Sequence, residues 1–162
     1  MMILREVKIQ FREYSGVEEL PEAWAGLVSE ARKVSGLAYS PYSGFRVGAA
    51  VLLANGTVIT GNNQENAAYP SGLCAERTAI FYANANFPDI PVTALAISAA
   101  SAKGRVKEPV KPCGSCRQVI LETEARFGQP VILILDGRNG IQVFDGIDDL
   151  LPFSFKPVAL KG

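Results

Sequence analysis

Hydrophobic and polar positions change their spacing several times along the chain, and each change predicts an element. Val7, Ile9 and Phe11 alternate with polar residues, which is typical of a strand. In residues 17–34 the apolar side chains recur three and four positions apart, as on one face of a helix. Gly36 follows where that helix should end.

The rest of the chain predicts a hairpin and then alternating helices and strands. Apolar runs at 47–54 and 57–60 flank Asn55-Gly56, a dipeptide that favours a tight hairpin turn. The further predicted helices are 74–85 and 113–127, the second capped by Gly128, and the further predicted strands are 93–99, 131–135 and 142–144. This order predicts one α/β domain over residues 17–162, with helices flanking a single sheet, preceded by a strand-like extension over residues 1–16.

Composition and charge narrow the classes of partner and location. The chain has 162 residues, of which 48% are hydrophobic, so it can fill a core. Lys and Arg together number 16, as do Asp and Glu, so there is no basic excess of the kind that binds a nucleic acid polymer. Arg5, Glu6 and Lys8 interrupt the first apolar residues, and no run approaches the length that crosses a bilayer. We therefore expect a cytoplasmic protein with no membrane partner.

The chain contains no histidine, which excludes several kinds of active site. Ser–His–Asp triads, Cys–His pairs and histidine-ligated metals cannot form. Acid–base chemistry near neutral pH must then come from a carboxylate, thiol or amine with a shifted pKa, or from a metal-bound water.

The three cysteines predict a metal site. Cys74, Cys113 and Cys116 all lie at the start of a predicted helix, where the unpaired N–H groups favour thiolate. Structural zinc normally has four protein ligands, whereas catalytic zinc keeps one position for water. Three thiolates without a fourth cysteine or a histidine therefore favour the catalytic kind. Glu76 is placed to supply a carboxylate beside that water.

Less specific interpretations of the same residues are open. The Cys-x-x-Cys pair taken alone is equally typical of a redox dithiol, and three cysteines can be chemically idle in a cytosolic protein. An acidic residue such as Glu76 in a first helical turn is often only a partner of the helix dipole. Arg77 and Arg117, each near a ligand, are predicted to offset the charge of three thiolates through hydrogen bonds to sulfur.

Several segments closely resemble the small cytidine deaminases of pyrimidine salvage. The resemblance covers roughly residues 20–157 and rests on residues 39–43 (Tyr-Ser-Pro-Tyr-Ser), 47–50 (Val-Gly-Ala-Ala), 63–69 (Asn-Gln-Glu-Asn-Ala-Ala-Tyr), 74–79 (Cys-Ala-Glu-Arg-Thr-Ala), 112–118 (Pro-Cys-Gly-Ser-Cys-Arg-Gln) and 150–152 (Leu-Leu-Pro). It implies a three-layer α/β/α sandwich with a mixed central sheet. It also implies one Zn²⁺ per subunit and hydrolysis of cytidine or 2′-deoxycytidine to uridine or 2′-deoxyuridine with release of ammonia.

The resemblance also assigns roles to individual residues. Glu76 would take a proton from the zinc-bound water and deliver protons to N3 and the departing amine of the pyrimidine. The implied ligands of the nucleoside substrate are Phe45 on the ring, Asn63 and Glu65 on the ribose, Ala75 through its backbone, and Phe155 from a neighbouring subunit of a homotetramer with shared active sites.

Other features leave parts of this assignment open. Phe153 is an alternative for the cross-subunit ring, and Asn62 and Gln64 depart from the residues that most family members carry. A deaminase of another cytosine-bearing compound is the nearest enzymatic alternative, and a non-catalytic zinc-stabilised domain is the alternative from a different class.

Overall fold

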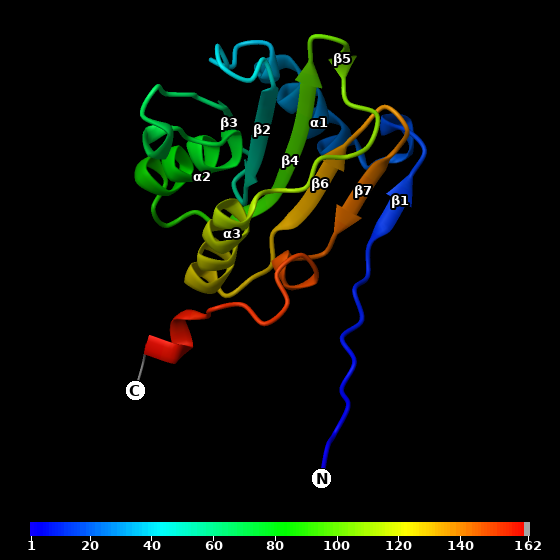
Figure 1. The fold of residues 1–162 in the computed structure, drawn as a ribbon, viewed down its shortest axis with the longest axis vertical. Coiled ribbons are helices and arrows are strands. Elements are labelled where there is room, and N and C mark those ends of the chain that lie inside the picture. Colours follow the sequence, from blue (N-terminus) through cyan, green and yellow to red (C-terminus); the bar gives the residue numbers. More distant parts are fainter. Residues whose placement is uncertain (161–162) are drawn as a thin grey trace.

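A single mixed sheet organises the computed structural model, which describes residues 1–160 (Figure 1). Six strands lie in the order β1-β7-β6-β4-β2-β3, and the short β5 pairs with the end of β4. The strands are β1 (Arg12–Tyr14), β2 (Arg46–Leu53), β3 (Val58–Asn62), β4 (Val92–Ser101), β5 (Gly104–Arg105), β6 (Ile132–Asp136) and β7 (Ile141–Phe144). Only β4 and β6 run parallel among these pairs, because the chain between them crosses over through a helix.

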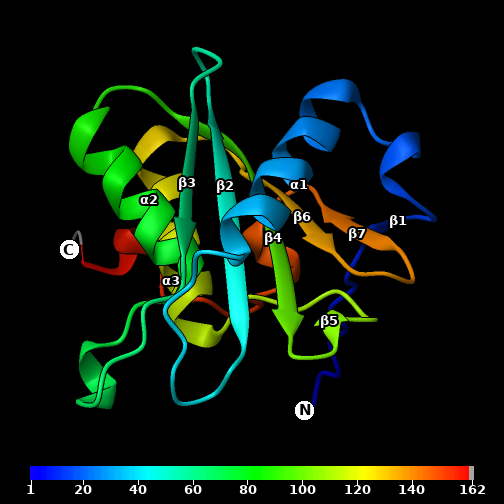
Figure 2. The same ribbon diagram turned by 90° about the horizontal axis from the view of Figure 1, so that it is seen from above.

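Three helices cover the two faces of the sheet (Figure 2). They are α1 (Glu22–Ser35), α2 (Ala75–Asn86) and α3 (Gly114–Phe127). Helix α1 packs on one face around Leu27, Val28 and Ile134, whereas α2 and α3 pack on the other around Ile80 and Ile120. These layers confirm the expected three-layer α/β/α sandwich with a mixed central sheet.

Most predicted elements form within a few residues of their expected bounds. Helix α1 ends before Gly36, Asn55-Gly56 joins β2 to β3, and Gly128 follows α3 in the left-handed conformation with φ of 65°. After the N-terminal extension, two features differ from the prediction. Residues 17–19 form a separate 3₁₀ turn before α1, and β5 is too short to leave a pattern in the sequence.

The strand-like extension pairs with the sheet over only three residues. Within residues 1–16, Arg12–Tyr14 form β1 against β7, and residues 1–11 leave the sheet as an extended segment that ends far from the domain (Figure 1). The alternation at Val7, Ile9 and Phe11 therefore marks extended backbone outside the sheet.

A glycine allows α2 to lie unusually close to β3. A Cβ atom at Gly61 would stand 2.6 Å from the backbone nitrogen of Ala79 and 2.8 Å from the carbonyl oxygen of Ala75. Real Cβ contacts are not this short, so only glycine permits the observed distance between strand and helix. This contact fixes the first turn of α2, which carries part of the candidate site.

Candidate metal and catalytic site

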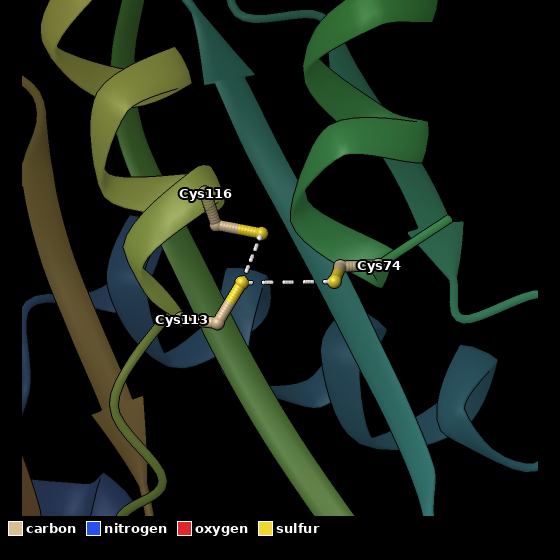
Figure 3. A group of neighbouring side chains, drawn as sticks. All are labelled: Cys74, Cys113 and Cys116. Atoms are coloured by element: carbon tan, nitrogen blue, oxygen red, sulfur yellow. Dashed lines mark hydrogen bonds between the residues drawn. The ribbon is translucent and has the colours of Figure 1, made fainter. Parts of the chain in front are cut away.

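All three cysteines lie at helix starts that meet above the sheet, as the sequence predicts (Figure 3). Cys74 is the residue before α2, Cys113 is the residue before α3, and Cys116 lies in the first turn of α3. Both helices pack on the same face of the sheet, so their positive ends point to one place. Residues 39 positions apart in the sequence are brought together in this way.

The spacing of the sulfur atoms fits one zinc ion. The Sγ atoms of Cys74 and Cys113 are 3.8 Å apart, and those of Cys113 and Cys116 are 3.5 Å apart. All three lie within 4.8 Å of one another. Tetrahedral zinc with Zn–S bonds near 2.3 Å holds its sulfur ligands about 3.8 Å apart. Thiolate is also a donor that zinc prefers, so the residues present fit the metal.

Arg77 donates a hydrogen bond to the ligand set, as predicted. Its Nη2 lies 3.5 Å from the Sγ of Cys74. The thiol of Cys116 and the guanidinium of Arg77 hydrogen-bond the Cys74 sulfur and lower the pKa of Cys74 to about 5. The pKa of Cys116 is raised, by the hydrogen bond it gives to the Cys74 thiolate and by its burial. A guanidinium on a sulfur ligand reduces the excess negative charge that three thiolates impose on a zinc ion.

Arg117 has a different role from the predicted one. Its Nε donates to the carbonyl oxygen of Pro112 at 2.8 Å, and its Nη1 donates to the carbonyl oxygen of Leu150. In the described part of the chain, the guanidinium thus bonds to carbonyl oxygens and to no sulfur atom, so the expectation of a hydrogen bond to sulfur was wrong for this arginine. It ties the start of α3 to the C-terminal part of the chain instead.

Glu76 is a buried carboxylate in the first turn of α2. Its side chain is only 5% exposed, and burial raises its pKa above the ordinary value for a glutamate. The negative charge of the nearby Cys74 thiolate raises that pKa further. A carboxylate whose pKa is moved toward neutrality is suited to both accepting and donating a proton. A mere partner of the helix dipole has no need of such burial.

A cavity of about 550 Å³ opens beside Cys74 and Arg77. The polar loop after β3 supplies much of its lining, including Asn63, Glu65 and Tyr69. Among the described residues, the lining includes neither Phe45 nor Glu76. The cavity is open enough for a small polar ligand and lies directly next to the thiol cluster.

Asn63 and Glu65 hold the loop that borders this cavity. The amide of Asn63 accepts from the backbone N–H of Val47 at 2.7 Å and donates to the carbonyl oxygen of Phe45 at 2.9 Å. The carboxylate of Glu65 accepts from the hydroxyl of Ser43 and from the backbone N–H of Tyr42 at 2.8 Å. These two hydrogen bonds lower the pKa of Glu65. Their ribose-binding role stays a prediction.

The other predicted ligands of the substrate are placed in different surroundings. Ala75 is fully buried as the first residue of α2, and Phe45 is half-buried immediately before β2. Phe155 is 61% exposed and Phe153 is 94% exposed, both on the C-terminal segment. Exposed rings at this position are available to another chain, and their role stays a prediction.

Sequence reasoning missed the residues that support these ligands. Ser43 and Tyr42 position Glu65, and Gln118 donates from its Nε2 to the carbonyl oxygen of Phe155 at 3.0 Å. Ser43 and Gln118 lie within the motifs that carry the resemblance, so the motifs point to these two residues as important. The residues they bond to, Glu65 and Phe155, are distant in the sequence, and the sequence pattern does not show which residue each one contacts.

Comparison with known proteins identifies the family to which this chain belongs. The model of the cytidine and deoxycytidylate deaminase zinc-binding region matches residues 23–129, which include all three cysteines and Glu76. The chain belongs to this deaminase family. A cytidine deaminase from Halalkalibacterium halodurans is 48% identical over 96 residues, which cover 59% of this chain and 68% of the relative. A cytidine deaminase from Mycobacterium tuberculosis is 39% identical over 99 residues, covering 61% and 70%.

Solved structures of the deaminase family share the fold. The crystal structure of a cytidine deaminase from Burkholderia pseudomallei superposes with a TM-score of 0.69 at 37% identity, covering 80% of this chain and 97% of that one. The resemblance found in the sequence is thereby confirmed, and with it the α/β fold of a zinc-binding deaminase. Among residues 1–160, no helix has the length and apolar character needed to cross a bilayer.

Proposed function

We propose that this deaminase hydrolyses the bond between C4 and the exocyclic amine of cytidine and 2′-deoxycytidine. The products are uridine or 2′-deoxyuridine and ammonia. A three-thiolate cluster with a buried carboxylate next to one of its ligands carries the proposal. The names of the relatives support cytidine as the substrate. Conversion of cytidine nucleosides to uridine nucleosides is a step of pyrimidine salvage.

Cys74, Cys113 and Cys116 would hold the zinc ion at the junction of α2 and α3. When bound, zinc acts as a Lewis acid that lowers the pKa of water beside the substrate. The backbone of Ala75, which lies between a ligand and the acid–base residue, is proposed to hydrogen-bond the pyrimidine and orient it.

Glu76 is proposed to move all the protons of the reaction. Its carboxylate takes one proton from the water that attacks C4 and passes it to N3 of the pyrimidine. It then takes the second proton of that oxygen and passes it to the exocyclic nitrogen, which leaves as ammonia. The C4–N bond breaks, a C4–O bond forms, and the carboxylate returns to its starting state. The raised pKa of Glu76, caused by its burial, supports this double use.

The sugar is proposed to lie in the cavity beside Cys74, next to Asn63 and Glu65. Both side chains already hold the loop around Ser43, so they offer the sugar only their remaining hydrogen-bonding positions. The arrangement supports a small nucleoside, and the neutral charge of the chain gives no support to a polymeric substrate. A cytoplasmic location is proposed because three free cysteines are kept reduced there.

Ultraviolet-monitored turnover of zinc-loaded protein tests the proposal. Cytidine should be converted to uridine with one ammonia per nucleoside, while adenosine and free cytosine should remain unchanged. Measuring zinc content on the same sample separates two kinds of failure. Protein that holds about one zinc per chain and leaves cytidine intact would refute the substrate, and active protein without zinc would refute the metal.

The active protein is further proposed to be a homotetramer in which Phe155 completes the site of a neighbouring chain. Phe155→Ala should then lower kcat/KM for cytidine about tenfold or more, because an aromatic ring stacked on a base is lost. Phe153→Ala is the matched control, since both rings are exposed on the same segment. A larger loss with Phe153→Ala would assign the contact to that ring.

A further inference from the structure

The N-terminal arm, residues 3–11, exposes apolar side chains along most of its length, and Val7 borders a pocket with Leu151 and Phe153. Ile3 is 69% exposed, Val7 56% and Ile9 54%, although each is aliphatic. The root of the arm is fixed: Phe11 stacks on Phe144 with centroids 5.2 Å apart, and the backbone N–H of Gln10 donates to Asp149. Beyond this root, no backbone hydrogen bond involves residues 3–9 in the described part of the chain.

The arm has the pattern of a strand that lacks its neighbour. Its odd-numbered residues from Ile3 to Phe11 are apolar except for Arg5, its even-numbered ones from Glu6 to Gln10 are polar, and it contains neither proline nor glycine. An extended segment with unpaired N–H and C=O groups is a template for pairing with another strand. Since β1 continues directly into the arm, such a pair would extend an existing sheet instead of standing alone in water.

We infer that the arm pairs with the same arm of a second copy of this chain. The two arms run antiparallel around a two-fold axis at Val7. In this register Glu6 of each copy lies opposite Lys8 of the other, so two oppositely charged pairs form by symmetry. Ile3 lies opposite Phe11, which places the apolar residues of both arms on one face. Centring the pair on Arg5, Glu6 or Lys8 would instead place like charges opposite each other. Centring it on Ile9 would place Glu6 opposite Arg12 and Arg5 opposite Glu13, but Arg12 is already paired with Asp145 and Glu13 with Gln142 in their own chain.

The geometry of the domain leaves room for this pairing. The arm projects away from the sheet, with its end far from α2 and α3 (Figure 1). With about 3.4 Å per residue, the three steps from Val7 to Gln10, the first residue whose backbone bonds to the domain, place that contact about 10 Å from the axis. Two domains therefore lie at opposite ends of the ribbon, and neither covers the thiol cluster of the other. The inference goes beyond the deaminase activity and does not depend on it.

Disulfide trapping in the full, zinc-loaded chain tests the register. Val7→Cys should form a covalent dimer under mild oxidation, because residues on the axis face their own copies. Ile9→Cys is the matched control: it has nearly the same exposure, but its copies lie four residues apart in this register, beyond the reach of a disulfide. The parent chain gives the background from Cys113, which is exposed. Equal yields from both variants, or no dimer from Val7→Cys, would overturn the pairing.

Exchange of charges tests the same register independently. In the Val7→Cys background, Glu6→Lys or Lys8→Glu should slow dimer formation about tenfold, since each creates two like-charged pairs. The combination of Glu6→Lys with Lys8→Glu should restore the original rate, because opposite charges face each other again. A double variant as slow as the single ones would overturn the assignment. Zinc content, which depends on the domain and not on the arm, checks that every variant is folded.

Discussion

The starts of α2 and α3 are built alike but contribute different things to the site. Each helix is preceded by a cysteine, and each has an arginine near its ligands. At the start of α2, Arg77 hydrogen-bonds a ligand and Glu76 is buried beside it. At the start of α3, Arg117 instead binds two carbonyl oxygens, one of them on the C-terminal segment. One helix start thus supplies the reacting groups, and the other supplies ligands and anchors the chain around them.

Loss of a ligand from α3 should have the largest effect, because the anchoring helix also carries two of the three sulfur atoms. We expect Cys113→Ser to lose bound zinc and all measurable turnover, since two thiolates cannot hold the ion at micromolar concentration. Metal analysis after gel filtration measures this directly. A variant that retains one zinc per chain would show that the ligand set is different.

Glu76→Gln should separate chemistry from metal binding. The amide keeps the size of the side chain but cannot carry the proton, so turnover should fall by about 10²–10⁴. Zinc content should stay at the level of the parent protein, because Glu76 is not a ligand. Turnover close to that of the parent would contradict the role proposed for this carboxylate.

The two arginines offer the most direct test of the comparison. Arg77→Gln removes a positive charge from the Cys74 sulfur and should lower zinc affinity or turnover about 10- to 100-fold. Unfolding by denaturant should change little, since Arg77 makes its hydrogen bond to the cluster.

Arg117→Gln should lower the stability of the fold and leave zinc affinity nearly unchanged. It removes hydrogen bonds to Pro112 and Leu150, so the free energy of unfolding should fall by about 1–3 kcal/mol. Zinc affinity should remain near that of the parent chain. The same profile for both arginines, in zinc affinity and in stability, would erase the distinction between the two helix starts.

The smallest effect is expected at the other end of α3, where Glu124 makes a second anchor. Its carboxylate accepts from the backbone N–H groups of Val131 and Ile147 at 2.9 and 3.0 Å. Burial nevertheless raises the pKa of Glu124 in the fold. The folded state therefore binds this proton more readily than the unfolded state. The resulting stabilisation is full below about pH 4.3 and is lost as the pH rises through the raised pKa.

Glu124→Gln provides the measurement for this anchor. The neutral amide can still accept both hydrogen bonds but does not titrate. The stability of the parent chain relative to this variant should therefore decrease as the pH rises from 4 to 7 in urea titrations. A difference that stays constant, or grows with pH, would contradict the raised pKa.

The sequence predicted elements and ligands better than it predicted supporting contacts. The periodicity located α1, α2 and α3, and the three cysteines at helix starts predicted a metal cluster that the fold assembles. Arg77 and Arg117 show where this reasoning ends. Both stand near ligands in the sequence, but the direction of a side chain depends on what the fold brings beside it. Leu150 reaches Arg117 only through the path of the chain after β7.

The extension before Arg12 shows the same limit for backbone pairing. Alternation of apolar residues predicted a strand, but a strand forms only where a neighbour offers hydrogen bonds. The sheet offers them at β7 for just three residues. The alternation in residues 3–11 is that of a strand, but within residues 1–160 no strand pairs with residues 3–9.

The absence of a side chain at Gly61 determines how close α2, and with it Cys74, lies to β3. Any larger residue there would have its Cβ within 2.8 Å of the α2 backbone, so the helix would have to retreat by roughly the ångström that separates this from ordinary contact. Cys74 moves with that helix, whereas Cys113 and Cys116 belong to another. Metal–ligand distances are held to about 0.2 Å, so the retreat would exceed the error that coordination allows. The spacing between Cys74 and the two cysteines of α3 thus depends on a glycine of β3 that is not itself a candidate ligand.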